Sequence, residues 1–261
     1  MGYTWHHKLL IPSQLNPPSA ANQSMESVHL SHHYSQQFNA DLEAIHNDVS
    51  NMGALVEQQL QQAIAALQSG SSEQGEQVVA NDYKVNAYDV DIDEQCTTIL
   101  ALRQPTASDL RLVLTVIKTT ADLERIGDEA KRIARMAIRT QTSDPGRNLH
   151  TRIEHLGTQV CAMLHRALQA FVSLDVEEAI AVASEDARID REYESLMRES
   201  MTYMMEDPRS IPQLMDIIWS ARALERIGDR CCNICEYILY FVKGKDVRHT
   251  SLEQIQKEFS E

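Results

Sequence analysis

Apolar residues recur at intervals of three and four along most of the chain. In the clearest run, from about residue 38 to 67, a single stripe is formed by Leu42, Ile45, Val49, Met52, Val56, Leu60, Ile64 and Leu67. Such spacing places the apolar side chains on one side of an α-helix. Similar patterns predict further helices over about 73–103, 110–138, 149–174, 176–205 and 210–242. The sequence therefore predicts an all-α protein of six helices.

Turn residues mark where these helices end. Gln104-Pro105 stops the second helix, because proline cannot continue the hydrogen-bond ladder, and Lys243-Gly244 stops the sixth with a terminating glycine. The stretch Thr142-Ser143-Asp144-Pro145-Gly146 is the most punctuated in the interior, and we place the domain boundary there. We expect a disordered leader over 1–35, one domain over 36–143, a second over 149–244, and a polar tail over 245–261 that frays after Val247.

The chain contains an internal duplication. The sequence Leu-Glu-Arg-Ile-Gly-Asp occurs at 123–128 and again at 224–229. Further upstream, Met52-Gly53, Val56, Leu60 and Ala63 match Leu156-Gly157, Val160, Leu164 and Ala167. Two repeats of three helices joined by short loops predict two antiparallel three-helix bundles related by pseudo-symmetry.

Acidic residues occupy matching places in the two repeats. Each hexapeptide carries a Glu and an Asp four residues apart, which are Glu124 with Asp128 and Glu225 with Asp229. That spacing puts both carboxylates on one helix face, where they repel each other. A second acidic row lies on the preceding helix and consists of Asp82 and Asp89 in the first repeat and of Asp186 and Asp190 in the second. If the two helices pack side by side, the rows face each other.

Facing carboxylates have two explanations at this stage. They suit hard cations such as Mg²⁺, Mn²⁺, Ca²⁺ or Fe³⁺, which would also remove the repulsion. Alternatively, they form an ordinary solvated helix face. Gly127 and Gly228 lie between the two acids of each hexapeptide, inside a predicted helix. Glycine costs about 1 kcal/mol there relative to alanine, so we expect another helix to approach closely at both.

Composition excludes several classes of function. The net charge of −14 argues against a non-specific grip on nucleic acid. Five cysteines cannot all pair within one chain, which favours reduced thiols, and Cys231-Cys232-x-x-Cys235 reads as small core residues rather than a zinc motif. No apolar run reaches the roughly 18 residues that span a bilayer. Glycine-rich phosphate loops and nucleophile motifs are also missing. We expect a cytoplasmic protein that is not an enzyme.

Four motifs are specific enough to compare with known families. They are Gln104-Pro105-Thr106-Ala107-Ser108-Asp109-Leu110-Arg111, Asp122 with the first hexapeptide, the second hexapeptide, and Tyr240-Phe241-Val242-Lys243-Gly244. Together they resemble the PhoU family of phosphate-uptake regulators, and the resemblance covers about residues 36–249. It implies six helices in two similar bundles, and metal binding by Glu124 and Asp128 and by Glu225 and Asp229. The facing acids Asp82, Asp89, Asp186 and Asp190 are then their partners, and the expected metal ions are Fe, Mn, Mg or Zn. Asn86 and Tyr193 break the symmetry of the two sets and argue against assuming equal loading.

The resemblance also implies a role. It suggests negative regulation of the phosphate-starvation response by an adaptor that links the ATPase of the phosphate-specific ABC transporter to a membrane sensor histidine kinase. Such a protein would form a homodimer and reach the membrane through its partners. The alternative hypothesis is a metal-dependent enzyme or ion-handling protein that acts on phosphate compounds.

Overall fold

The computed structural model describes residues 26–139, 147–248, 250, 254–255 and 257. The chain divides into two units, Met1–Gln37 and Phe38–Glu261. Of the first unit, the structure describes the beginning of helix α1 (Glu26–Ser69), which starts inside the stretch expected to be a disordered leader. The rest of that leader and the expected domain boundary at Thr142–Gly146 lie outside the described residues.

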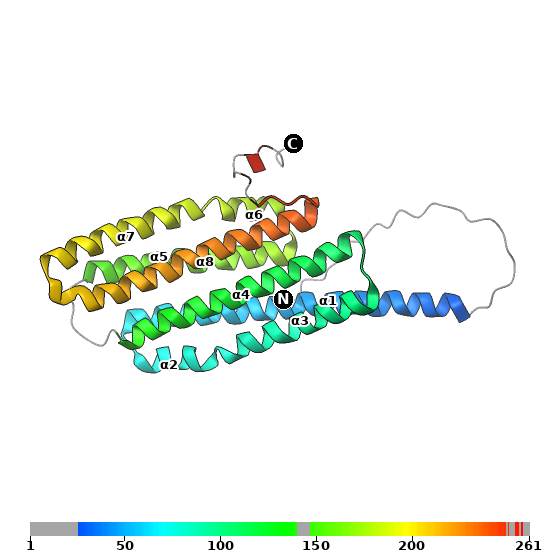
Figure 1. Ribbon diagram of the computed structural model, residues 1–261, viewed down its shortest axis with the longest axis horizontal. Helices are drawn as coiled ribbons and strands as arrows, with labels where there is room; N and C mark the ends of the chain where they lie inside the picture. The colour runs from blue at the N-terminus through cyan, green and yellow to red at the C-terminus, as the bar shows by residue number, and fades with distance from the viewer. Residues whose placement is uncertain (1–25, 140–146, 249, 251–253, 256, 258–261) are drawn as a thin grey trace. The chain divides into compact units, whose positions relative to one another are not determined.

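The helices follow the predicted order (Figure 1). The first repeat contains α1, α2 (Ser72–Asn81), α3 (Tyr83–Arg103) and α4 (Ala107–Arg139). The second contains α5 (Arg147–Ser173), α6 (Val176–Ala183), α7 (Asp186–Glu206), the 3-10 helix η1 (Pro208–Ser210) and α8 (Ile211–Lys243). No β-strand occurs in the described part of the chain. The prediction of an all-α fold built from two sets of three helical segments is confirmed. We call these segments rods, and the second rod of each repeat consists of two helices, α2 with α3 and α6 with α7.

The second rod of each repeat is interrupted, which the sequence did not predict. A single helix was expected over 73–103 and another over 176–205, whereas α2 and α3 are separated at Asp82, and α6 and α7 at Ser184–Glu185. At the first break the Val85 N–H donates to the Asp82 carbonyl at 3.0 Å, and at the second the Glu185 N–H donates to the Val182 carbonyl at 3.0 Å. Both bonds close the tighter turn of a 3-10 helix. Asp82 and Asp186 therefore stand at matching interruptions.

The predicted helix ends at Arg103 and Lys243 are confirmed. Gln104 follows α3 with a left-handed φ of 48°, and Gly244 follows α8 with a φ of 71°. The Gly244 N–H donates to the Tyr240 carbonyl at 2.9 Å and so satisfies one of the last carbonyls of the helix. Glycine adopts this backbone conformation without steric cost.

The two repeats share one core. The helices that carry the hexapeptides, α4 and α8, run side by side (Figure 1). Leu123 and Ile126 on α4 and Leu224 and Ile227 on α8 are fully buried in one continuous apolar cluster. Burying these faces against each other removes apolar surface from water, which is the main favourable term in folding.

Helices α1 and α5 also join the two repeats, and they do so reciprocally. A Cβ atom at Gly53 of α1 would lie 2.7 Å from Leu168 Cδ2 of α5. In the same way, a Cβ atom at Gly157 of α5 would lie 2.9 Å from Ile64 Cδ1 of α1. Each glycine therefore makes room for a large aliphatic side chain of the other repeat, which agrees with the pseudo-symmetry predicted from the sequence.

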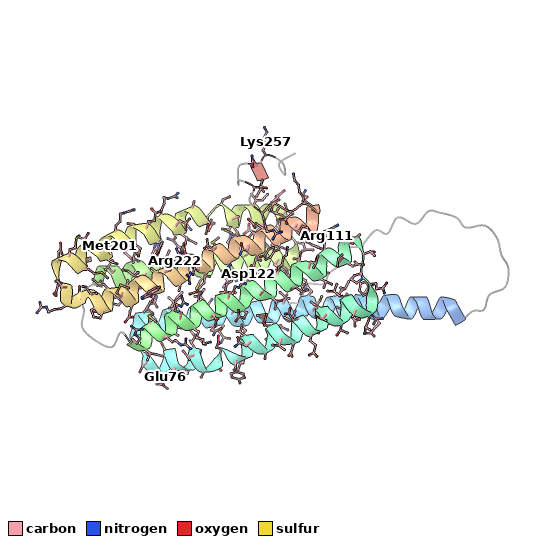
Figure 2. The ribbon with its side chains drawn as sticks, in the orientation of Figure 1. Glu76, Arg111, Asp122, Met201, Arg222 and Lys257 are labelled. Atoms are coloured by element: carbon pink, nitrogen blue, oxygen red, sulfur yellow. The ribbon has the colours of Figure 1, made fainter. Side chains whose placement is uncertain are left out.

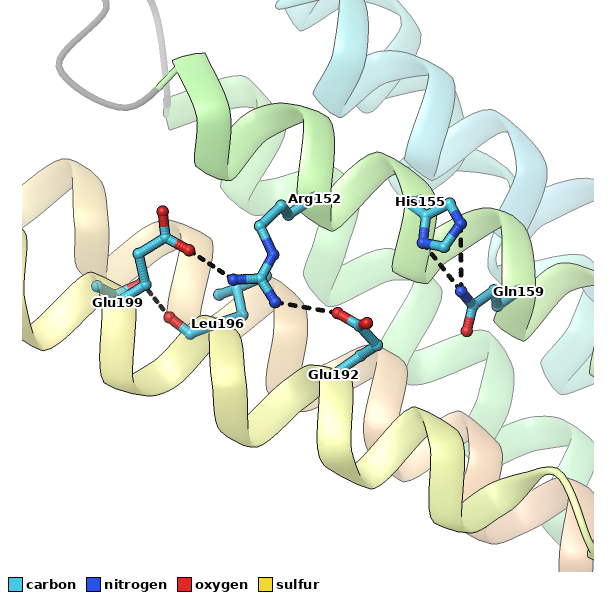
Figure 3. Close-up of polar contacts among 7 residues, drawn as sticks. Arg152, His155, Gln159, Glu192, Leu196 and Glu199 are labelled. Carbon is cyan, nitrogen blue, oxygen red and sulfur yellow. Dashed lines mark hydrogen bonds and ion pairs between the residues drawn. The ribbon is translucent and has the colours of Figure 1, made fainter.

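Ion pairs connect rods within the second repeat (Figure 3). Arg152 of α5 extends between two glutamates of α7 and donates to Glu192 Oε2 at 3.0 Å and to Glu199. All three side chains are partly exposed, so the contribution to stability is modest.

Two residues after α8 are buried. Val247 is 1% exposed and Ile255 is 5% exposed, and both belong to one apolar cluster with Leu239 of α8. Val176 and Ile180 of α6 complete this small apolar cluster. One buried aliphatic side chain contributes about 1.5–3 kcal/mol, so Ile255 helps to hold the described part of the tail on α8.

Gly75 provides a test of the contact between α2 and α4. A Cβ atom there would lie 2.7 Å from Ile138 Cγ1 and 2.9 Å from the Ala134 carbonyl oxygen. Alanine at a free helical position would add up to about 1 kcal/mol of stability. Here we expect Gly75→Ala to reduce the free energy of unfolding by about 1–3 kcal/mol, because the backbone of α4 must move. Denaturant titration measures this change. Gln77→Ala, at an exposed neighbouring residue of α2, is the control. A gain in stability for Gly75→Ala would refute the packing described.

Candidate functional site

The first acidic cluster consists of Asp82 and Asp89 from the second rod and Glu124 and Asp128 from α4. Burial raises the pKa of Glu124, and the negative charges of Asp128, Asp89 and Asp82 raise it further, while Arg125 opposes them. Burial also raises the pKa of Asp89. The structure thus brings the four acids that the sequence singled out in the first repeat within electrostatic reach of one another.

Lys131 and Gln59 donate hydrogen bonds to acids of this cluster. Neither residue was identified from the sequence. The Lys131 ammonium donates to Asp82 Oδ2 at 2.6 Å and to Asp128 Oδ1 at 3.3 Å. The Gln59 side-chain amide donates to Asp82 Oδ1 at 3.1 Å. The hydrogen bond to Asp82 is the main reason why the pKa of Lys131 is raised. The spacing of Lys131, one turn after Asp128, was the signal available in the sequence.

The second acidic cluster consists of Asp186 and Asp190 from α7 and Glu225 and Asp229 from α8. Burial raises the pKa of Asp186 to about 6, with further contributions from the charges of Asp190 and Asp229. The pKa values of Glu225 and Asp229 are also raised, first by burial and then by their acidic neighbours. Here too the structure brings together the four acids identified in the sequence.

Two oxygens of the second cluster are buried without a hydrogen-bond partner. They are Asp186 Oδ1 and Glu225 Oε2. Glu225 is only 9% exposed. Its other carboxylate oxygen, Oε1, accepts a hydrogen bond from Arg222 Nη1 at 2.6 Å. The Arg222 guanidinium also lies over the Tyr193 ring, 5.6 Å from its centroid. Buried carboxylate oxygens without donors are rare and costly, so this pair needs an explanation.

The glycines of the hexapeptides explain how the helices come so close. A Cβ atom at Gly127 would lie 3.2 Å from Val85 Cγ1 of α3, and one at Gly228 would lie 3.1 Å from Asp186 Oδ1 of α7. The predicted close approach of another helix at both glycines is therefore confirmed. In the second repeat the approaching group is one of the unpartnered acids itself.

Neither cluster is a ready-made metal site in the geometry seen here. Within the described residues, no three His, Cys, Asp or Glu side chains stand in position to hold a metal ion. Carboxylate oxygens are nevertheless the ligands that hard cations prefer, and side-chain rotation changes their mutual distances. Cys231 and Cys235, predicted to be core residues, are fully buried free thiols.

Asp122, immediately before the first hexapeptide, links the two repeats (Figure 2). This carboxylate on α4 is 1% exposed. Its Oδ2 accepts a hydrogen bond from the Tyr237 hydroxyl of α8 at 2.8 Å, and its Oδ1 lies 3.5 Å from Arg230 Nη1 of the same helix. Burial and the bond to Asp122 raise the pKa of Tyr237. This contact could not be predicted from the sequence, because its partners Tyr237 and Arg230 are more than a hundred residues away from Asp122.

Comparison with known proteins decides the family. The model of the PhoU domain matches the chain twice, over residues 49–137 and 153–238. The chain belongs to the PhoU family. Each PhoU domain match includes one hexapeptide together with the acids of the preceding rod.

Individual PhoU proteins match over most of their length. The phosphate-specific transport system accessory protein PhoU of Serratia marcescens is 50% identical over 233 residues, which are 89% of this chain and 96% of the relative. The Escherichia coli K12 protein of the same name is 48% identical over the same shares of both chains. The crystal structure of PhoU from Pseudomonas aeruginosa superposes with a TM-score of 0.77 at 45% identity and covers 80% of this chain and 100% of that chain. That of the phosphate transport system regulatory protein PhoU from Streptococcus pneumoniae gives 0.73 at 30% identity, covering 80% of this chain and 99% of that one.

Membership in this family gives the chain a role in the phosphate system. PhoU proteins are named as accessory and regulatory proteins, and the prediction that the chain is not an enzyme is thereby confirmed. The alternative hypothesis of a metal-dependent enzyme is not supported. None of the helices in the described part of the chain is long and apolar enough to cross a membrane.

Proposed function

We propose that the chain is a negative regulator of the phosphate regulon that acts in the cytoplasm. In this proposal it is an adaptor between the ATPase of the phosphate-specific ABC transporter and the sensor histidine kinase of the phosphate two-component system. The observation that carries the proposal is the match, at 50% identity over 96% of its length, to a protein named as an accessory of phosphate-specific transport. We further propose a homodimer that reaches the membrane through its partners.

Exposed apolar side chains offer surface for such partners. Met201 and Met205 near the end of α7 are 52% and 76% exposed, and Ile211 at the start of α8 is 41% exposed. All three lie close in sequence to the connection between α7 and α8, and Met201 is labelled in Figure 2. Methionine adapts its shape to different partners and is common on surfaces that bind more than one protein. This end of the second repeat is therefore our candidate for partner contact.

We also propose that cations bind at the acidic clusters, with Fe, Mn, Mg and Zn as the candidate metals. The support is the carboxylate donor set together with the raised pKa values of Glu124, Asp186 and Glu225, which result first from burial and then from the negative charges of the neighbouring acids. A bound cation would supply positive charge between the second and third rods. The protein residues would orient the oxygens and shield them from water.

The adaptor role is tested by removing the gene. We expect its deletion to derepress an alkaline-phosphatase reporter in high phosphate, and expression of the full chain to restore repression. Met205→Glu should fold normally, because the side chain is exposed, and yet repress poorly and retain less transporter ATPase in a pull-down. Val90→Glu is the matched control, since Val90 is 63% exposed on α3 of the other repeat. A deletion strain that keeps full repression would refute the proposed function.

A further inference from the structure

Basic residues of α4 recur at intervals of seven. They are Arg111, Lys118, Arg125, Arg132 and Arg139. Seven residues make almost two turns of an α-helix, so these side chains follow one side of α4 at steps of about 10.5 Å. The row from the first to the last is about 42 Å long and runs along nearly the whole helix. A chain with a net charge of −14 thus carries an extended row of positive charge.

The row lies beside α8, which adds three more basic residues. The two helices run antiparallel, because the Arg111 Nε donates to the Phe241 carbonyl at 3.4 Å and Arg139 pairs with Asp216 at 2.8 Å. Arg111, Asp122 and Arg222 are labelled along the two helices in Figure 2. We call the following set the basic strip: Arg111, Lys118, Arg125, Arg132 and Arg139 of α4, and Arg222, Arg226 and Arg230 of α8.

Acids at the junction of α4 and α8 lie beneath the guanidinium groups. Asp122 and Glu129 each pair with one arginine from α4 and one from α8. The pairs are Asp122 with Arg125 and Arg230, and Glu129 with Arg132 and Arg226. The two acid side chains are 1% and 14% exposed, whereas the four arginine side chains are 33% to 57% exposed. Four positive charges therefore face solvent above two shielded negative charges, which hold them in place.

Two acids on the same helices are exposed, and both lie near basic side chains. Asp128 of α4 pairs with Lys131 at 3.3 Å. Asp229 of α8 is within electrostatic reach of the three arginines that α8 contributes to the strip. The exposed acids therefore do not cancel the positive charge of the strip.

Aromatic side chains of α8 lie among the basic residues. Trp219 precedes Arg226 by seven residues and is 46% exposed. The Lys118 ammonium lies 5.4 Å from the ring centroid of Tyr237 and 5.2 Å from that of Tyr240. Trp and Tyr are enriched where proteins meet lipid headgroups, and Lys and Arg are attracted by anionic lipids. The face formed by α4 and α8 combines both kinds of residue.

We propose that the basic strip, together with Trp219, docks the chain directly on an anionic lipid surface. A bilayer is flat, so it presents negative charge and a headgroup layer for the indole along the whole row, which favours it over an acidic protein. Acids on the remote side of the chain are screened from the bilayer, because the Debye length is about 8 Å at physiological ionic strength. The inference goes beyond the proposed function, in which the chain reaches the membrane through its partners.

Sedimentation of the purified full chain with lipid vesicles tests the inference. The wild type should bind vesicles of phosphatidylglycerol mixed with phosphatidylcholine and not vesicles of phosphatidylcholine alone. Binding should be lost at an ionic strength of about 1 M, where the Debye length is about 3 Å. Arg125→Gln combined with Arg132→Gln should weaken binding about tenfold or more, since each basic residue near an anionic surface contributes about fivefold.

Two matched double variants serve as controls. Arg188→Gln with Arg198→Gln makes the same change in charge at exposed arginines of α7 and should bind like the wild type. Arg125→Lys with Arg132→Lys keeps the charge of the strip and should also bind like the wild type. Far-ultraviolet circular dichroism checks that each variant is folded. Equal losses in the strip variant and in the α7 variant would overturn the inference, because net charge alone would then explain binding.

The fluorescence of Trp219 reports which face meets the lipid. The chain has two tryptophans, so Trp5→Phe leaves Trp219 as the only one. On the anionic vesicles its emission should move to shorter wavelength and become protected from quenching by acrylamide. Unchanged quenching in the bound chain would overturn the assignment of this face.

An acidic protein is the competing partner for the basic strip. A wild type that ignores anionic vesicles, together with a strip variant that retains less transporter ATPase in a pull-down, would identify that partner and refute the lipid proposal. Absence of vesicle binding alone would also refute it. Repression of the reporter in the deletion strain is measured separately, so failure of the adaptor role is distinguishable from these outcomes.

Discussion

Replacing Asp122 with alanine is expected to lower the free energy of unfolding by about 3 kcal/mol. The carboxylate is buried between α4 and α8, where it accepts the hydrogen bond from Tyr237 and pairs with Arg230. Alanine would leave a partly buried hydroxyl and a guanidinium without their acceptor, and such unmet groups cost more than the pairing itself contributes. Urea unfolding followed by far-ultraviolet circular dichroism measures the loss.

A double-mutant cycle shows whether the loss comes from this contact. Tyr237→Phe alone should cost about 1 kcal/mol. The double variant should cost less than the sum of the two single changes, because the second change removes a partner already lost. Asp91→Ala, at an exposed carboxylate of α3, should stay within about 0.5 kcal/mol of the wild type. Additive effects of Asp122 and Tyr237 would mean that the bond between the repeats contributes nothing measurable.

The regular part of the fold could be predicted from the sequence, because it depends on local patterns. The apolar stripe from Leu42 to Leu67, the stop at Arg103 and the terminating Gly244 are all local signals, and all three are found in the structure. The hexapeptide repeat also placed the acids on matching rods. Periodicity assigned Glu124 and Asp82 to successive helical segments, but that these segments pack side by side is known only from the structure.

The breaks at Asp82 and at Glu185 could not be predicted for a physical reason. Glycine or proline usually marks a helix interruption in the sequence. Here the breaks are at Asp82 and Glu185, which keep right-handed helical backbone angles with φ of −57° and −80°. At each break the backbone changes only from the four-residue hydrogen-bond spacing of an α-helix to the three-residue spacing of a 3-10 helix. A residue of any type can make that change, so no residue type marks it.

The partners of the acids were also hidden, because they are set by packing between distant segments. Gln59 reaches Asp82 across 23 residues, and Tyr237 reaches Asp122 across 115. Lys131 was closest to being predictable, since its spacing from Asp128 is that of a helical ion pair. Its main partner is nevertheless Asp82 on another rod, and only the packed structure identifies it.

Phe171→Ala is expected to cost about 3–5 kcal/mol, the largest loss that we predict for a single change. The ring, at the end of α5, is 1% exposed and stacks on His46 of α1, with centroids 5.7 Å apart and planes inclined by 7°. Its removal leaves a cavity where α1 packs against α5, which is the second contact between the repeats besides that of α4 with α8. Phe171→Leu refills part of that volume and should cost about half as much. Tyr83→Ala, at an aromatic residue that is 65% exposed, should change stability by no more than about 0.5 kcal/mol.

The shape of the Phe171→Ala transition is as informative as its midpoint. Because the buried side chains of both repeats form one continuous cluster, the two repeats should unfold together. Probes placed in α3 and in α7 should therefore report the same, shifted midpoint. If the probe in α7 reported unfolding at a lower denaturant concentration than the probe in α3, the repeats would be independent bundles that merely touch. In that case the buried contact of Asp122 on α4 with Tyr237 on α8 would not make the two repeats unfold as one unit.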